Sequence, residues 1–216
     1  MMLHGFVLRT VKWGEHGLIV DLFTREQGRV SVAATIGRRR SSQAYWQPLN
    51  LLAVECVKGR GRLPQVHETA FVHPYADLTL QPMKRMIAMY LSEVLGLVLR
   101  AEQTDPLLYD YVEDALLWLD AARTGWANFH IVFLLHLTRF VGIYPNPEDL
   151  ESHLLAPDEV RLLRFLLSVD VGTMHHLRLS RTQRRDILQR IERYYRLHFP
   201  SLSEVRSLDI LREVLD

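Results

Sequence analysis

Cysteine is almost absent from this sequence of 216 residues, which contains one copy, Cys56. A single thiol cannot form an internal disulfide, and it excludes a zinc site built from several cysteines. Long apolar runs are absent too. Even the largely apolar segment from Phe129 to Leu135 contains His130, ends at His136 and is too short to cross a bilayer. With no basic segment preceding an apolar core at the N-terminus either, we expect a cytoplasmic protein.

Motifs of catalysis and metal binding are also missing. The sequence contains no P-loop, no nucleophile elbow and no glycine-rich dinucleotide motif after a predicted strand. Its ten histidines include no HxxxH or HExxH pair: His175 and His176 are adjacent, and His130 and His136 lie six residues apart on a predicted helix. We therefore predict no metal, no cofactor and no enzymatic activity.

Lysine is scarce, since it supplies only three of the 26 cationic side chains. Arginine suits phosphate groups because its planar guanidinium donates two parallel hydrogen bonds. Charge is also segregated. Residues 1–80 carry ten Lys/Arg and six Asp/Glu, a net of +4; residues 81–170 carry seven and thirteen, a net of −6; residues 171–199 carry seven and two, a net of +5. The two basic regions favour polyanionic partners.

The N-terminal region is predicted to form five short β-strands. Alternating apolar and β-branched residues place these strands at residues 6–11, 18–24, 29–36, 49–58 and 63–71. Glycine-rich turns separate several of them, and a long polar loop follows the third. This pattern suits a small OB-type barrel, although a split β-sandwich or an SH3-like barrel would produce nearly the same one.

After Pro82 the apolar residues recur with the period of a helix. Helices are predicted at residues 82–98, 105–119, 127–141, 157–168, 180–198 and 207–215. The third is apolar nearly all round, which is typical of the central helix of a bundle. We therefore predict an α+β protein, with an OB-fold nucleic-acid-binding domain at residues 1–80 and a helical bundle domain at residues 81–216.

The polar loop after the third strand is the main candidate for nucleic-acid binding. Arg38, Arg39 and Arg40 can pair with successive phosphates, and Tyr45 or Trp46 can stack on a base. Six further cations of the barrel region join this candidate surface: Arg9, Lys12, Arg29, Lys58, Arg60 and Arg62. The competing interpretation is a solvated charge run beside aromatic residues at the edge of the core.

A second basic zone lies on and just before the helix at residues 180–198. It contains seven arginines, Arg190 among them, and six of these form the candidate site: Arg178, Arg181, Arg184, Arg185, Arg193 and Arg196. The apolar face of this helix is defined by residues such as Ile187 and Ile191, and we expect Arg185, Arg193 and Arg196 to be exposed on the other side. The zone is either a solubilising face, a second nucleic-acid surface, or a site for an acidic, hydrophobic partner peptide.

Several segments resemble the RecO family of bacterial recombination mediators. Leu8-Arg9-Thr10 with Gly14-Glu15, followed by the run from residue 19 to residue 28, resembles the N-terminal signature of that family. The segments at residues 37–42 and 47–49 resemble its basic loop and the exit from it. Residues 139–146, 193–198 and 208–215 resemble later parts of the family, so the similarity covers essentially the whole chain.

The resemblance implies an OB-fold followed by a helical domain in a non-enzymatic protein of the cytoplasm and nucleoid. It implies binding of single- and double-stranded DNA, annealing of complementary strands and, with RecR, loading of RecA onto DNA coated by single-stranded DNA-binding protein. The C-terminal tail of that coating protein would dock on the helical domain. Many members have four cysteines after the segment matching Gly142 to Pro145, and this sequence has none there. A non-enzymatic OB-fold interaction scaffold and an RNA-binding protein are the alternatives.

Overall fold

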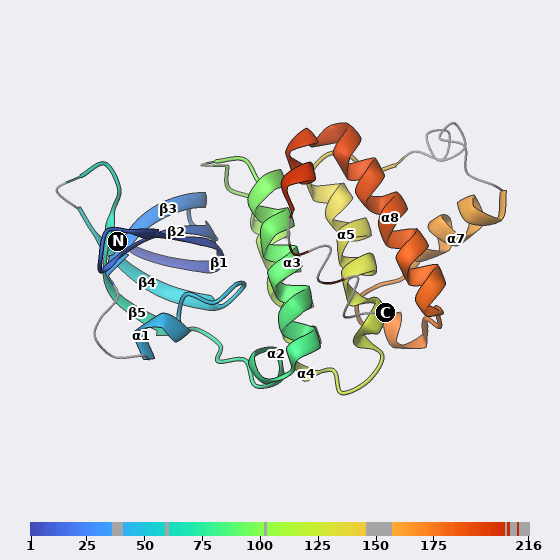
Figure 1. The fold of residues 1–216 in the computed structure, drawn as a ribbon, viewed down its shortest axis with the longest axis horizontal. Helices are drawn as coiled ribbons and strands as arrows, with labels where there is room; N and C mark the ends of the chain where they lie inside the picture. The colour runs from blue at the N-terminus through green and yellow to red at the C-terminus, as the bar shows by residue number, and fades with distance from the viewer. Residues whose placement is uncertain are drawn as a thin grey trace.

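The computed structural model describes residues 1–35, 41–58, 61–101, 103–145, 157–205, 207 and 211. A β-barrel lies at one end of the molecule and a bundle of helices at the other (Figure 1). The barrel strands are β1 (Met2–Trp13), β2 (Gly17–Thr24), β3 (Gly28–Thr35), β4 (Leu51–Val57) and β5 (Gln65–Phe71), with the short helix α1 (Ser41–Ala44) between β3 and β4.

The five strands form a closed barrel in the order β1-β2-β3-β5-β4. Closure depends on β1, which pairs through residues 2–6 with β4 and through residues 5–13 with β2. A bulge between Val7 and Arg9 accompanies this change of partner. On the opposite side the barrel is joined by a parallel pairing of Ala33 with Gln65. This topology is an OB-fold, so the predicted fold class is confirmed over the sandwich and SH3-like alternatives.

The interior of the barrel is filled by alternate residues of its strands. Val32 and Ala34 of β3 point inward, as the alternation in the sequence predicts. Cys56 lies in the same cluster at 2% exposure, where it packs as a small hydrophobic side chain, and burial raises the pKa of its thiol.

The helical region begins with α2 (Asp77–Leu80) and continues through α3 (Pro82–Val98), α4 (Pro106–Ala121), α5 (Phe129–Phe140), α7 (Pro157–Ser168) and α8 (Arg181–His198). Short 3-10 turns lie at Trp126–Asn128, Met174–His176 and Pro200–Glu204. Pro82 and Pro106 occupy the first turns of α3 and α4, where no backbone donor is needed. The predicted helix at residues 207–215 falls outside the described residues except for Ser207 and Leu211. Among the described helices, none is both long and apolar enough to cross a membrane.

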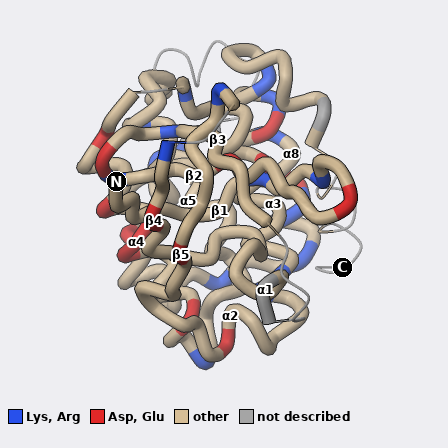
Figure 2. Tube along the Cα trace, turned by 90° about the vertical axis from the view of Figure 1, so that its left-hand side faces the viewer, with Lys and Arg blue, Asp and Glu red and all other residues tan. Residues whose placement is uncertain are grey.

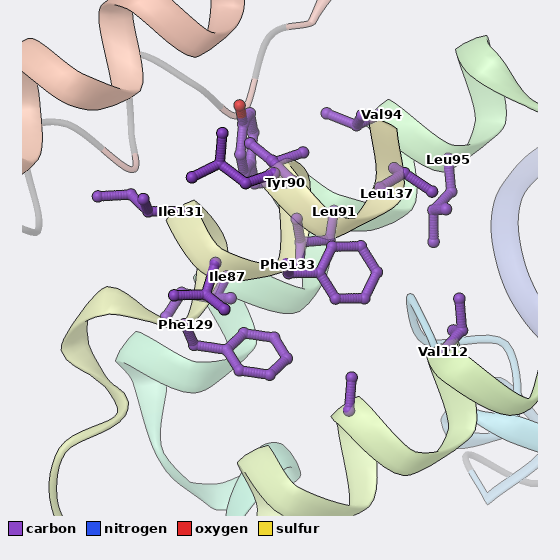
Figure 3. Close-up of a cluster of buried hydrophobic side chains, with 14 of the residues drawn as sticks. Ile87, Tyr90, Leu91, Val94, Leu95, Val112, Phe129, Ile131, Phe133 and Leu137 are labelled. Carbon is purple, nitrogen blue, oxygen red and sulfur yellow. The ribbon is translucent and has the colours of Figure 1, made fainter. Parts of the chain in front are cut away.

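Helix α5 is the central helix, as its sequence predicts. Its residues 129–138 are all buried. Figure 3 shows Phe129, Phe133 and Leu137 of α5 beside Leu91 and Leu95 of α3. Burying apolar side chains on every side of one helix gives the bundle a single continuous core.

The barrel and the helices share one hydrophobic core. The barrel residues in the helical core cluster are Phe6, Leu8, Phe23, Leu49 and Leu51. The rings of Phe6 and Phe23 lie 5.1 and 5.7 Å from the ring of Tyr109 on α4. Arg25 adds a polar contact, because its guanidinium lies over Tyr109 and forms an ion pair with Asp110.

Candidate nucleic-acid interface

The β1–β2 hairpin forms an exposed arm on the barrel, which we define as residues 9–16. Every residue of the arm is exposed. Its tip turns at Gly14, whose φ of 68° is the conformation that favours glycine. Trp13, directly before this turn, is 64% exposed. An aromatic ring held so far into solvent by a paired strand is a platform on which an unpaired base can stack.

The arm carries two of the predicted cations. Arg9 and Trp13 are four residues apart on β1, so they lie on the same face of the strand, whereas Lys12 lies on the other. Both cations are exposed, and neither forms an ion pair with another residue of the described chain. Their charges are therefore available to phosphate groups.

The β4–β5 turn brings further cations to the same end of the barrel. Strand pairing fixes its place: Val57 pairs with Gln65, Gln65 pairs with Ala33 on β3, and the end of β3 pairs with Gly17 beside the arm. Lys58 and Arg62 lie in this turn and are exposed. The outer face of strands 2 and 3, with the loops 1–2 and 4–5, is the usual ligand site of OB-folds. Figure 2 views the molecule from the side on which the barrel lies.

Four predicted residues of this surface fall outside the described residues: Arg38, Arg39, Arg40 and Arg60. The three consecutive arginines follow shortly after Thr35, the last residue of β3.

The structure corrects the prediction for Trp46. Its side chain is 7% exposed and belongs to the core cluster of the barrel, so it is not available to a base. Tyr45 is half-buried, and its ring stacks on Phe71 with the centroids 4.6 Å apart. Both rings are occupied by intramolecular packing. Trp13, which sequence reasoning did not select, is the exposed aromatic residue of the arm. Its position between Lys12 and a glycine turn was the signal that could have found it.

Arg29 is also corrected. Its Nη1 donates hydrogen bonds to the carbonyl oxygens of Gly96, at 2.6 Å, and Leu99, at 3.4 Å. Its Nη2 lies 3.6 Å from a carboxylate oxygen of Asp21. The guanidinium is committed to these partners because the C-terminal end of α3 covers this part of β3. Arg29 therefore joins the barrel to the helices and is not a free phosphate ligand.

The second basic zone is exposed on α8, as predicted for Arg185, Arg193 and Arg196. Arg178 and Arg181 are also exposed, whereas Arg184 is half-buried and donates a hydrogen bond to the carbonyl of Leu179 at 2.9 Å. Beside Arg196 lies a small pocket between α3, α5 and α8. It is lined mainly by apolar and aromatic residues, which include Tyr90, Val94, Leu134, Ile191, Tyr195 and Leu202.

Metal binding finds no support in the ranges that the structure describes. They contain no group of three or more His, Cys, Asp or Glu side chains placed to hold an ion. Cys56 is buried inside the barrel, and it is the one cysteine of the chain, so no second thiolate can join it as a ligand. The residues present do not fit a cysteine-ligated zinc ion.

The fold and this surface define an OB-fold protein with an attached helical domain. A family model described as "Recombination protein O N terminal" matches residues 1–75, and one described as "Recombination protein O C terminal" matches residues 82–149. The chain is 34% identical to the DNA repair protein RecO of Phocaeicola vulgatus, with 97% of each chain covered. It is 33% identical to that of Bacteroides fragilis, with 98% of each covered, and 30% identical to that of Flavobacterium johnsoniae, with 96% of each covered.

The chain therefore belongs to the RecO family of DNA repair proteins.

Proposed function

We propose that this protein is a recombination mediator that binds single- and double-stranded DNA and anneals complementary strands. With RecR it helps to load RecA onto DNA coated by single-stranded DNA-binding protein. The observation that carries the proposal is the arm, which exposes Trp13 together with the cations Arg9 and Lys12 at the end of the barrel where the β4–β5 turn lies. Family membership supports the repair context, and no motif of catalysis accompanies the surface.

The chemistry of the arm explains why binding would not depend on base sequence. Arg9, Lys12, Lys58 and Arg62 offer contacts to the phosphate backbone, which every sequence presents alike. Trp13 can stack on any base because every base has a π-face. Neither interaction uses the edges that form Watson–Crick pairs. Two strands held in this way keep their pairing edges free, which is the requirement for annealing.

The helical domain offers a separate place for a protein partner. The pocket beside Arg196 has a volume of about 10 Å³ and combines an apolar lining with two charged residues, Glu192 and Arg196. An acidic peptide with hydrophobic residues suits both properties, because its apolar side chains can pack against this lining while a carboxylate pairs with the guanidinium of Arg196. We infer that the C-terminal tail of the single-stranded DNA-binding protein docks there.

DNA binding is tested by fluorescence anisotropy with a labelled oligothymidylate at several salt concentrations. We expect Arg9→Ala with Lys12→Ala, and separately Lys58→Ala with Arg62→Ala, to weaken binding and to flatten its dependence on log salt. Each lost phosphate contact lowers the slope by about 0.7 for a single strand. The matched control is Arg85→Ala with Arg123→Ala, two exposed cations of the helical domain. If the control pair has the same effect as the arm pair, the DNA site is not on the arm.

Docking of the tail is tested with a synthetic C-terminal peptide of the coating protein. We expect Arg196→Ala to weaken peptide binding about tenfold, the usual effect of removing one charge-assisted hydrogen bond, and to leave oligothymidylate binding unchanged. Arg185→Ala on the same helix serves as the control. Equal peptide affinity for the wild type and Arg196→Ala would place the tail elsewhere.

A further inference from the structure

A second groove lies on the helical domain, away from both basic surfaces. It has a volume of about 330 Å³ and runs between α4, α5 and the segment that follows α7. Trp118 of α4 supplies an aromatic wall, and Tyr111, whose ring stacks on Phe133, Phe140 and His136, closes the groove beside His136 of α5. Asp114 and Asp170 line the same groove, one from each side. It forms in the region whose net charge is −6, over residues 81–170.

The carboxylates of the groove have no intramolecular cation. Asp114 and Asp170 are both exposed, and in the described chain no ion pair or side-chain hydrogen bond engages either carboxylate. Arg139, whose charge acts on His136 of the same groove, is committed elsewhere. Its Nη2 donates a hydrogen bond to the carbonyl of Leu167 at 3.1 Å, and its guanidinium lies over the ring of Tyr144.

His136 gives the groove a third hydrogen-bond acceptor. Its side chain is buried, at 7% exposure, and its Nε2 lies 2.8 Å from the carbonyl oxygen of Val169. A carbonyl oxygen only accepts, so Nε2 must carry the proton and donate. Nδ1 of the neutral ring then holds a lone pair, and no described residue donates to it. Burial lowers the pKa of this imidazole, which keeps the ring neutral.

The polar lining therefore consists of acceptors, two of them negatively charged, beside the indole ring of Trp118. A ligand that satisfies all of these groups must be cationic, must donate several hydrogen bonds and must stack on an aromatic face. A guanidinium meets these requirements, because it is planar and has five N–H donors in a fixed arrangement. Phosphate groups are excluded by charge, so the groove cannot extend the DNA surface.

We propose that this groove receives an arginine side chain from a basic segment of a partner protein. The inference is independent of DNA binding, because the groove shares no residue with the arm or with the pocket beside Arg196. It adds a second protein-binding site to the helical domain. This groove selects a basic partner, whereas the pocket beside Arg196 selects an acidic one.

The test uses the full-length protein with ¹⁵N-labelled tryptophan, and it follows the indole N–H signal of Trp118, assigned with Trp118→Phe. The probe is the blocked tripeptide acetyl-Gly-Arg-Gly-amide. Its neutral isostere contains citrulline, and a third peptide contains lysine. We expect saturable shifts with the arginine peptide and binding weaker by about tenfold with the other two, because each loses a charge or a planar set of donors.

Variants then test the acceptors. Asp114→Asn with Asp170→Asn is expected to weaken binding of the arginine peptide by about tenfold or more. Glu68→Gln with Asp186→Asn removes the same charge from exposed positions outside the groove and should leave binding unchanged. Equal shifts with citrulline, or full binding by the double Asn variant, would overturn the proposal.

Two further outcomes would assign the groove to another occupant. Free L-arginine binding at least about tenfold more tightly than the blocked peptide would indicate a small-molecule site, because a protein segment has no free amino or carboxyl group at this residue. Concentration-dependent dimers, seen by sedimentation for the wild type and lost in the double Asn variant, would indicate a second copy of this chain. Either result overturns a partner protein as the occupant.

Discussion

Trp13 and Trp46 are the same side chain in opposite surroundings. Trp46 packs among the strands of the barrel at 7% exposure, whereas Trp13 stands at the tip of the arm at 64% exposure. Their roles follow from these surroundings. Trp46 contributes apolar surface to the stability of the barrel, whereas Trp13 lies outside both core clusters and is largely exposed to solvent.

Replacing Trp13 with Ala should therefore reduce DNA binding without reducing stability. Loss of one stacking platform is worth about 1–3 kcal/mol, so single-stranded DNA should bind about five- to 150-fold more weakly. Unfolding by urea should change by less than about 0.5 kcal/mol, as for other exposed positions. Trp46→Phe provides the contrast, since it should lower stability and spare DNA affinity. Unchanged affinity of Trp13→Ala would remove the ring from the interface.

His130 is a buried titratable residue with an effect on stability. Its side chain is fully buried, and both ring nitrogens lack hydrogen-bond partners within the described chain. Burial, aided by the charge of Arg184, lowers the pKa of this imidazole to about 3. In the unfolded chain the same imidazole has a pKa near 6.5. Between these two values the unfolded state binds a proton that the folded state does not.

The free energy of unfolding should therefore fall as the pH drops below about 6.5, with a limiting slope of about 1.4 kcal/mol per pH unit from this residue. His136 acts in the same direction, because burial lowers its pKa too. Urea unfolding at pH 7.5 and pH 5.5 measures the difference. His130→Leu fills this site with an apolar side chain that does not titrate, so its free energy of unfolding should fall less between pH 7.5 and pH 5.5. An equal loss in the variant would contradict the role of His130.

Among the elements, the turn between β2 and β3 shows how closely the barrel meets the helical domain. Gly28 has a φ of 68°, and a Cβ atom there would lie 2.0 Å from the carbonyl oxygen of Gln103. Gly14 in the arm has the same φ of 68°, but a Cβ atom there would have no heavy atom within 4 Å. The two glycines share one backbone conformation and differ only in their neighbours.

Alanine at these two positions separates backbone strain from steric overlap. Gly14→Ala should cost only the left-handed conformation, about 1–2 kcal/mol. Gly28→Ala should cost that amount and in addition the displacement of the backbone at Gln103, so its loss of stability should exceed the first by at least about 1–2 kcal/mol. Thermal unfolding of both variants measures the difference. Equal losses would show that the loop at Gln103 moves away freely.

Local patterns predicted most of the elements. The alternation in β3 and the prolines that begin α3 and α4 act over a few residues, and each is present in the structure. The site was less predictable. Lys12 and Lys58 are exposed as expected, but the roles of Arg29 and Trp46 are set by contacts with distant segments. No periodicity in the sequence shows that the C-terminal end of α3 covers Arg29 or that the barrel encloses Trp46.

At the scale of the molecule, residues 1–80 carry a net charge of +4 and residues 81–170 a net charge of −6. The three consecutive arginines of the basic N-terminal region can therefore be tested together as one contribution to DNA binding. Arg38, Arg39 and Arg40 lie outside the described residues, and their part in DNA binding stays a prediction. Replacing all three with Ala should weaken binding of single strands and lower the slope against log salt by up to about 2, since each lost phosphate contact contributes about 0.7. Anisotropy titrations at several salt concentrations measure this. An unchanged slope would leave the arm and the β4–β5 turn as the main contacts.

The five barrel side chains buried in the helical core have a mechanical consequence. Phe6, Phe23 and Leu51 are part of the same apolar cluster as α3, α4 and α5, so the two halves cannot pivot without exposing it. A protein truncated near residue 80 would expose this apolar surface to water and would aggregate. In the intact protein the barrel and the helical domain form one rigid unit, so a ligand bound to the barrel and a ligand bound to the helices are held at a constant separation.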